Sequence, residues 1–225
     1  MSSSSPKVNF WVLYRETTRG KSIWRILMNE AMKQWREEVT GLVLDCACGS
    51  NPSYRRILGL THNEQVRLVG IDYDPALRPT IVADLTRSIP VKDGIADVVI
   101  VSGFLMLVPN PQELLKEVRR VLKSGGRLLL TAVLIAPYSP DPTDYMRFTA
   151  EGLSLLLHNA GFTDFEIVPV GNRFSAAAFL LEPFLRPRWI VAPSVHLLCL
   201  FLDRIVTYFK LRPCPIGYVV LARKR

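Results

Sequence analysis

Short apolar runs alternate with polar or amphipathic segments between residues 42 and 135, and this alternation constrains the fold more than any other feature. Because the runs are apolar on both faces, a sheet built from them must be covered on both sides. Segments with helical spacing lie between the runs, which indicates right-handed crossovers. We therefore predict a doubly wound, Rossmann-like α/β fold with a mostly parallel seven-stranded sheet. The expected strands are 42–46, 66–72, 80–84, 96–103, 127–135, 163–170 and 216–224.

Helices are expected before and between these strands. Residues 8–39 carry apolar and aromatic side chains at helical spacing, which predicts one or two N-terminal helices. Residues 110–122 show one apolar face, and a later helix is expected to begin at the N-cap Thr149 and to end at Gly161. These patterns predict a division into an N-terminal helical cap, a core and a helical insert. Their ranges are 1–40, 41–171 with 213–225, and 172–212, respectively.

The insert at 172–212 is the most individual part of the chain. It contains fourteen uncharged residues at 189–202, which are too few to span a bilayer and are interrupted by Pro193 and His196. Basic residues flank this run, namely Arg186, Arg188, Arg204, Lys210 and Arg212. Three roles fit this pattern: a cover over the substrate side, a homodimer contact, or a peripheral contact of 186–212 with an anionic membrane surface.

Charge and cysteine content narrow the classes of partner. The net charge of +8 comes with basic clusters in the last 40 residues but no compact basic helix, so we do not expect nucleic-acid binding. The four cysteines have no C-x-x-C spacing, which predicts neither a metal site nor a disulfide framework. Residues 1–6 lack the basic start and apolar run of a secretory signal. We therefore expect a cytoplasmic protein with free thiols, peripheral at the inner membrane face if the insert docks there.

The turn after the first strand consists of small residues, CACGSN at 46–51. In an open parallel sheet, ligands bind at the carboxyl ends of the strands. Ala47 keeps bulk away, Gly49 permits close approach of the backbone, and Asn51 tolerates a positive φ. The turn is therefore either a tight structural connection or a backbone bent around a ligand.

Carboxylates at the ends of neighbouring strands favour the ligand interpretation. Asp72 ends the second strand, where it can accept hydrogen bonds from both hydroxyls of a ribose. Asp84 and Leu85 end the third strand, where a carboxylate beside an apolar side chain suits an adenine. With Asp45 at the end of the first strand, this pattern predicts an adenosine-type site.

Several ordered motifs also resemble one family. VLDCACG, VGIDYDP, ADL, the segment from 89 to 131 and YMRFTAEGLSLLLHNAGF are similar to class I S-adenosylmethionine-dependent methyltransferases of the type 11 kind. The resemblance extends from about residue 42 to 170 and implies S-adenosylmethionine as cofactor. The DYMRFT segment further resembles a bacterial subgroup that acts on glycans or lipid-linked sugars.

The resemblance also implies roles for individual residues. It places Asp45 and Gly49 around the methionine part, Asp72 on the ribose, Tyr73 beside the adenosine, Asp84 and Leu85 on the adenine, and Ser102 and Gly103 at the sulfonium. Ala47, in the same turn, is also predicted to line the cofactor site. The family often carries a Glu-His pair after the fourth strand, where this chain has Met106 and Leu107. A histidine base at that position is therefore not expected.

The loop at 136–148 supplies the catalytic candidates. Asp144 or Tyr145 would be the general base, and Arg147 would hold an anionic acceptor. The alternative is that the Pro-Asp-Pro segment stiffens a lid while Arg147 pairs with a nearby carboxylate. For His158 and His196, helix surface or packing is favoured over catalysis.

These observations favour a methyltransferase that acts on an oxygen of a small-molecule, sugar or lipid-linked acceptor. The first alternative is a non-catalytic S-adenosylmethionine-binding partner or sensor, which the apolar Met106 and Leu107 leave open. The second is an NAD-dependent oxidoreductase, although CACGSN lacks the G-x-G-x-x-G spacing that accommodates a pyrophosphate.

Overall fold

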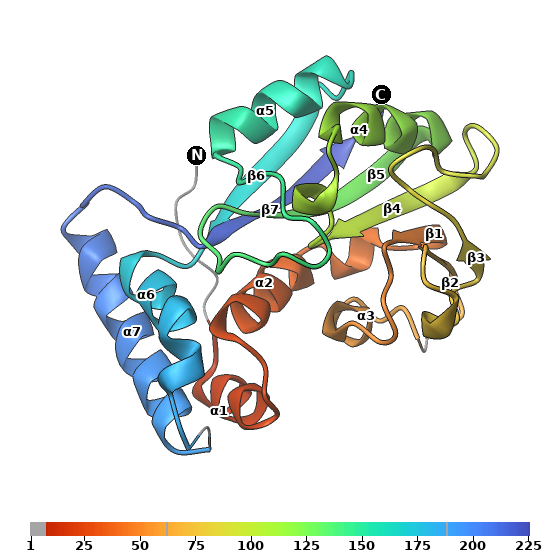
Figure 1. Cartoon of the computed structure of the whole chain (residues 1–225). Helices are drawn as coiled ribbons and strands as arrows, with labels where there is room; N and C mark the ends of the chain where they lie inside the picture. Colours follow the sequence, from red (N-terminus) through yellow and green to blue (C-terminus); the bar gives the residue numbers. More distant parts are fainter. Residues whose placement is uncertain (1–7, 62, 188) are drawn as a thin grey trace.

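A seven-stranded sheet forms the centre of the molecule, with the strand order β3-β2-β1-β4-β5-β7-β6 (Figure 1). The computed structural model describes residues 8–61, 63–187 and 189–225, so the N-terminal segment and Arg188 considered above lie outside the described residues. The strands are β1 (Gly41–Cys46), β2 (Val66–Asp72), β3 (Ile81–Val82), β4 (Ala96–Ser102), β5 (Leu122–Val133), β6 (Asp164–Val170) and β7 (Gly217–Arg223). β7 pairs antiparallel with both of its neighbours, and the other pairings are parallel. The predicted mostly parallel, seven-stranded sheet is confirmed.

Two strands differ from the prediction by more than two residues in length. β3 has two residues, because the chain turns at Asp84, whose carboxylate accepts a hydrogen bond from the N–H of Thr86. β5 begins at Leu122 rather than at 127, because Leu122 already pairs with Ala96 of β4 before a register shift. The shift accommodates the KSGG segment at 123–126 inside the strand.

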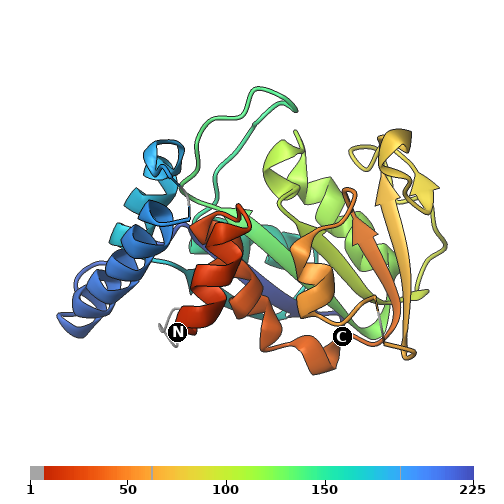
Figure 2. The same cartoon turned by 90° about the horizontal axis from the view of Figure 1, so that it is seen from below.

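Helices cover both faces of the sheet, as Figure 2 shows from below. The helices are α1 (Phe10–Thr18), α2 (Ile23–Lys33), α3 (Ser53–Ile57), α4 (Pro111–Val121), α5 (Ala150–Asn159), α6 (Arg173–Leu181) and α7 (Val191–Tyr208), with short 3-10 turns η1 (Arg36–Glu38), η2 (Pro75–Leu77), η3 (Leu105–Leu107) and η4 (Glu182–Phe184). α4 and α5 pack on one face, and α2, α3 and α6 pack on the other. Thr149 caps α5 as predicted, since its side chain accepts a hydrogen bond from the N–H of Gly152.

The fully apolar strands are explained by this two-sided cover. In β4, Val99 and Val101 belong to the core under α4 and α5, whereas Val98 and Ile100 belong to the core under α2 and α3. All four side chains are completely buried. Because successive side chains point to opposite faces, each strand contributes to two cores and needs apolar residues at every position.

The insert folds as two helices that pack against each other, and α7 also packs against α1 while α6 packs against α2 (Figures 1 and 2). His196 of α7 is buried, with its Nδ1 3.1 Å from the Thr17 hydroxyl and its Nε2 3.6 Å from Glu182. Asp203 accepts hydrogen bonds from the N–H groups of Phe174 and Ser175 and so caps α6. The Thr17 contact thus joins the insert to α1, the Asp203 contacts hold its two helices together, and His196 has the packing position expected for it.

The length of α7 differs from what the uncharged run indicated. The helix continues through Asp203 to Tyr208, and its eighteen residues have a mean hydropathy of 1.3. Among the described residues, it is the one helix long and apolar enough to cross a membrane by these two measures. Asp203 lies inside this window, and its carboxylate is committed to the N-terminus of α6.

Candidate active site

The turn after β1 adopts an unusual backbone. Ala47 has a φ of +53° and Gly49 a φ of +57°. For Ala47 this left-handed conformation costs about 1–2 kcal/mol, because its Cβ crowds the following carbonyl group. Asn51, which the sequence made a candidate for a positive φ, does not adopt one. The strain lies at Ala47, at the carboxyl end of β1 where ligands of such sheets bind.

Asp72 holds this turn against β2. Its Oδ2 accepts a hydrogen bond from the N–H of Gly49 at 2.9 Å, and its Oδ1 accepts one from the N–H of Asp74 at 3.3 Å. The side chain is buried, but the residue lines the adjacent cavity. Each carboxylate oxygen retains further acceptor capacity, which two neighbouring hydroxyls of a ligand would satisfy.

A cavity of about 840 Å³ opens beside this turn at the carboxyl edge of the sheet. Its wall includes six of the nine residues predicted for cofactor binding, which are Ala47, Gly49, Asp72, Tyr73, Asp84 and Leu85. The segments after β4 and β5 contribute Phe104, Leu107 and Pro142, and the segments around β3 complete the wall with Leu77, Val82, Ala83 and Thr86. The arrangement combines a carboxylate side with an apolar side in a volume typical of ligand pockets.

The Asp84 carboxylate is oriented by its own turn. Its Oδ1 accepts hydrogen bonds from the N–H of Thr86 at 3.0 Å and from the Thr86 hydroxyl at 2.6 Å. These bonds hold the pKa of Asp84 below its ordinary value. Its Oδ2 lies 3.3 Å from Nε of Arg87. The group is therefore a charged acceptor at the cavity wall, next to the buried Leu85.

Asp45 lies behind the turn, outside the cavity wall. The Tyr54 hydroxyl donates to its Oδ1 at 2.6 Å, and Arg55 donates to its Oδ2 at 2.8 Å. Burial raises the pKa of the Asp45 carboxyl, although Tyr54 and Arg55 act in the opposite direction. Asp45 thus joins β1 to α3 and supports the turn between them.

Ser102 and Gly103 also lie at the strand ends but not in the cavity wall. The N–H of Gly103 donates to the Thr131 hydroxyl at 2.9 Å, and the Ser102 hydroxyl lies 3.3 Å from the same oxygen. Gly103 has a φ of +70°, which lets the chain turn sharply after β4. These contacts connect β4 to β5 at the edge that the cavity opens on.

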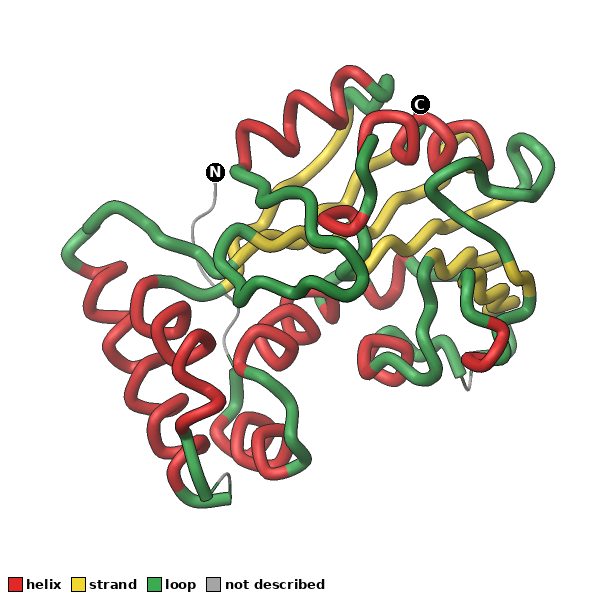
Figure 3. Tube along the Cα trace, viewed as in Figure 1, coloured by secondary structure: helices red, strands yellow, loops and turns green. Residues whose placement is uncertain are grey.

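The loop at 136–148 covers the same edge (Figure 3). Arg147 forms a two-pronged ion pair with Asp144, with one bond of 2.5 Å between its second terminal nitrogen and Oδ2. The Arg147 hydrogen bond lowers the pKa of Asp144. An ionised carboxylate with both oxygens bound to a guanidinium is a weak general base, and the observed pair matches the structural alternative for Arg147.

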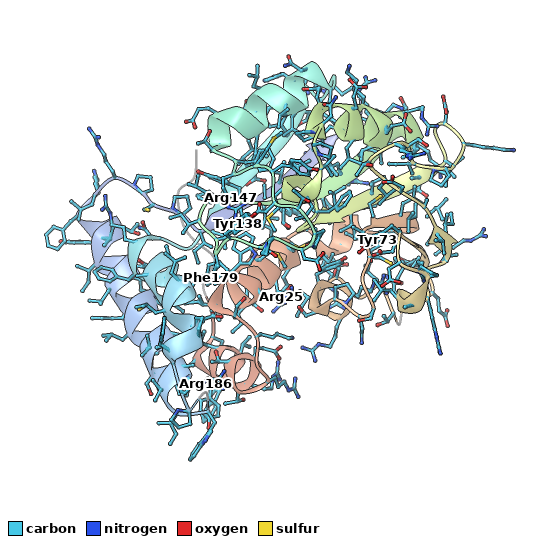
Figure 4. All side chains as sticks on the ribbon, in the orientation of Figure 1. Arg25, Tyr73, Tyr138, Arg147, Phe179 and Arg186 are labelled. Carbon is cyan, nitrogen blue, oxygen red and sulfur yellow. The ribbon has the colours of Figure 1, made fainter. Side chains whose placement is uncertain are left out.

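Tyr145 and Pro142 show how this loop meets the rest of the site. The N–H of Tyr145 donates to the carbonyl of Met106 at 2.9 Å, which ties the loop to η3, and its side chain is exposed. None of the three catalytic candidates lines the cavity wall, whereas Pro142 does. In Figure 4, Arg147 and Tyr138 of the loop lie apart from Tyr73 of the cavity.

Seven wall residues are not among those predicted for cofactor binding, namely Leu77, Val82, Ala83, Thr86, Phe104, Leu107 and Pro142. Phe104 and Pro142 are apolar residues in loops, and no local pattern distinguishes them from ordinary loop residues. Leu107, which stands where the family often has a polar residue, does line the cavity, while Met106 is half-buried beside it. The wall after β4 is therefore apolar, as the sequence indicated.

Comparison with known proteins identifies the fold and the domain. Residues 44–130 match the family described as "Methyltransferase domain" (type 11). Over 135 residues the chain is 30% identical to the ubiquinone/menaquinone biosynthesis C-methyltransferase UbiE of Caulobacter sp. (strain K31). This match includes 46% of the chain and 53% of that protein, so the chain spans about half the length of the curated relative it matches.

Solved structures agree on the fold. A SAM-dependent methyltransferase from Archaeoglobus fulgidus superposes with a TM-score of 0.60 at 18% identity, covering 96% of this chain and all of that one. Phosphoethanolamine N-methyltransferase 2 of Haemonchus contortus, in complex with S-adenosyl-L-methionine, superposes with a TM-score of 0.57 at 14% identity. That match covers 87% of this chain and 52% of the other. At these identities the likeness shows the fold alone.

Proposed function

We propose that this chain is a class I S-adenosylmethionine-dependent methyltransferase that methylates an oxygen of a small-molecule, sugar or lipid-linked acceptor. The observation that carries the proposal is the cavity at the carboxyl edge, whose wall contains Asp72 and Asp84 beside the strained turn at Ala47. When bound, the cofactor supplies an electrophilic methyl group on a sulfonium.

The residues of the wall fit a nucleoside. Asp72 has acceptor capacity for two ribose hydroxyls, and the Asp84 carboxylate with the Leu85 side chain suits an adenine amino group and ring. The positive φ of Ala47 and Gly49 turns the backbone so that it passes close to the cavity. Phe104 and Leu107 give the opposite side an apolar surface, which would strengthen polar contacts within the site once a ligand displaces water.

The acceptor has to lose its proton before or during transfer. Among the described residues of the cavity wall, the titratable groups are Asp72, Tyr73 and Asp84, all on the side assigned to the nucleoside. Asp144 is held by Arg147, which leaves Tyr145 as the exposed hydroxyl of the three catalytic candidates. We therefore favour acceptor oxygens that ionise readily and need mainly positioning, with Tyr145 as the residue that would assist.

Binding of S-adenosylhomocysteine to the purified chain, measured by calorimetry, tests the cofactor site. Asp72→Asn should weaken binding by at least about tenfold, because it removes the charge from hydrogen bonds worth about 1.5–3 kcal/mol each. Asp164→Asn, on the edge strand β6, is the matched control and should bind like the wild type. Wild-type protein that binds no S-adenosylhomocysteine, or Asp72→Asn that binds equally well, would refute the proposed site.

Turnover separates the remaining functions. Methyl-labelled S-adenosylmethionine is incubated with the protein and either a small-molecule extract or a glycolipid extract, and transfer of the label is followed. Binding without transfer to any extract would favour a non-catalytic partner or sensor. Stabilisation by NAD but not by S-adenosylhomocysteine in a thermal-shift assay would favour the oxidoreductase.

A further inference from the structure

Exposed apolar and aromatic side chains form a continuous face on α1 and α7, away from the cofactor cavity. Trp11 of α1 is 72% exposed, and Phe201 and Tyr208 of α7 are 58% and 82% exposed. The members of this outer face are Phe10, Trp11 and Tyr14 on α1, Leu197, Leu198, Phe201, Ile205 and Tyr208 on α7, and Phe209 and Leu211 after it. On α7 they recur every three or four residues, so they share one side of the helix.

The two helices meet in a shallow apolar groove. α1 and α7 pack side by side (Figures 1 and 2). A groove of about 530 Å³ lies between them, with Phe10, Leu198 and Phe201 in its wall and Arg204 at its rim. The outer face is therefore one surface built from two helices, and such an exposed apolar patch marks an interaction site.

Acidic and basic side chains of the insert differ in where they lie relative to the outer face. Within the described part of the insert, both acidic side chains turn inward. Glu182 accepts a hydrogen bond from the N–H of Ile23 at 2.6 Å, and Asp203 caps α6. The described basic residues of the same segment are exposed, namely Arg173, Arg186, Arg204, Lys210 and Arg212. A partner on this face meets aromatic groups surrounded by positive charge.

We propose that the outer face of α1 and α7, with residues 209–212, docks onto the surface of an anionic lipid bilayer with α7 lying in the membrane plane. Aromatic and leucine side chains bordered by Arg and Lys are the composition of interfacial helices. Anionic headgroups complement the exposed bases. A cytoplasmic protein docked in this way would lie peripherally at the inner face of the membrane.

The buried contacts of α7 favour this in-plane placement over a span. His196 and Asp203 face α1, Glu182 and α6 on the inner side of the helix. Moving α7 into a bilayer would expose both groups to hydrocarbon and remove the cap of α6, which is costly for polar groups. Docking of the outer face leaves every one of these contacts in place.

The position of the insert relates this surface to the cavity. The insert leaves the sheet after Val170 of β6 and returns at Gly217 of β7, and these two residues pair with each other beside Val133 at the end of β5. The insert therefore starts and ends at the carboxyl edge, where the cavity opens. A lipid-linked acceptor would then be held near that edge; this last step rests on the proposed methyl transfer, whereas docking itself does not.

Flotation of the purified full chain with lipid vesicles tests the proposal. We expect binding to phosphatidylcholine vesicles that contain phosphatidylglycerol, no binding to phosphatidylcholine alone, and a steep decrease as salt is raised. Phe201→Gln with Tyr208→Gln should reduce binding by at least about tenfold, since two interfacial aromatic side chains are lost. Leu155→Gln, at an exposed leucine of α5, is the matched control and should bind like the wild type.

A second pair of variants tests the charge. Arg204→Gln and Lys210→Gln should each lower binding about fivefold, whereas Lys116→Gln on α4 removes the same charge elsewhere and should have little effect. Equal losses for the double variant at Phe201 and Tyr208 and for Leu155→Gln, or no vesicle binding by the wild type, would overturn the proposal. A wild-type dimer that Phe201→Gln dissociates would assign the face to a second copy instead.

Measuring S-adenosylhomocysteine binding on the same variants distinguishes failure of membrane docking from failure of the proposed cofactor site. All these variants lie outside the cavity wall and should bind S-adenosylhomocysteine with the affinity of the wild type, which also shows that they are folded. Vesicle binding without S-adenosylhomocysteine binding would refute the proposed cofactor site but leave docking supported. The reverse result would refute docking alone.

Discussion

Replacing Asp45 by asparagine keeps the size of this buried side chain but removes its negative charge. The resemblance to methyltransferases implies that Asp45 shapes the pocket for the cofactor, whereas in the structure its carboxylate is taken up by Tyr54 and Arg55. The Asp45→Asn variant therefore distinguishes a direct effect on the cofactor from support of the turn between β1 and α3.

The expected loss of stability follows from these contacts. Removing one partner of a buried ion pair costs about 3–5 kcal/mol. Because 14% of the Arg55 side chain is exposed, Arg55 recovers part of its hydration, and we expect a loss of about 2–4 kcal/mol in the free energy of unfolding. Tyr54→Phe keeps the ion pair but removes a hydrogen bond to a charged group, which is worth about 1.5–3 kcal/mol. Since both changes act on one carboxylate, the double variant should lose less than their sum.

Urea denaturation followed by tryptophan fluorescence gives the free energies of unfolding. Calorimetry with S-adenosylhomocysteine on the folded variants gives the affinity. We expect the dissociation constant of Asp45→Asn to rise by less than about tenfold, because no hydrogen bond between Asp45 and the ligand is lost. An unchanged free energy of unfolding, with affinity reduced by more than about a hundredfold, would show that Asp45 contacts the cofactor directly and that our reasoning is wrong.

Three further predictions concern groups outside that network. Burial raises the pKa of Glu16, but hydrogen bonds and ion pairs from Lys21 and neighbouring arginines lower it overall from 4.5 to about 2. The ionised form therefore adds about 1–2 kcal/mol, after screening, to the free energy of unfolding above about pH 4.5, and this contribution is lost as the pH falls toward 2. In urea denaturation, Glu16→Gln should lack this part of the pH dependence. In the same assay, Gly217→Ala should lower the free energy of unfolding by at least about 3 kcal/mol, because the added Cβ would lie 2.3 Å from the carbonyl oxygen of Ala132. Gly94→Ala is the control: its Cβ would meet open space, so the loss should be about 1 kcal/mol. Asp144→Asn should lower methyl transfer by less than about tenfold, and a loss of about a hundredfold or more would identify Asp144 as a general base.

Local pattern was sufficient for the elements of the fold and for much of the cavity. The strands were predicted because residues such as Val98 to Val101 must be apolar on both faces of a covered sheet. Asp72 and Asp84 were predicted as neighbours because parallel strands end at one edge, and both line the cavity in the structure. These inferences need only the periodicity of the chain and the rule that connects strand ends to ligand sites.

Tertiary structure decided which side chains are available and which are engaged. The sequence made Asp45, Asp144 and Arg147 all candidate site residues, yet one carboxylate lies behind the turn and the other is paired with the arginine. Likewise, the hydroxyl of Thr17 meets His196 across 179 positions of sequence, and this contact orients α7 so that its aromatic side faces outward. Periodicity indicates which face of a helix is buried. Residues distant in sequence become neighbours only when the elements pack, and packing therefore decides which polar groups form contacts that stabilise the fold and are not available to a ligand.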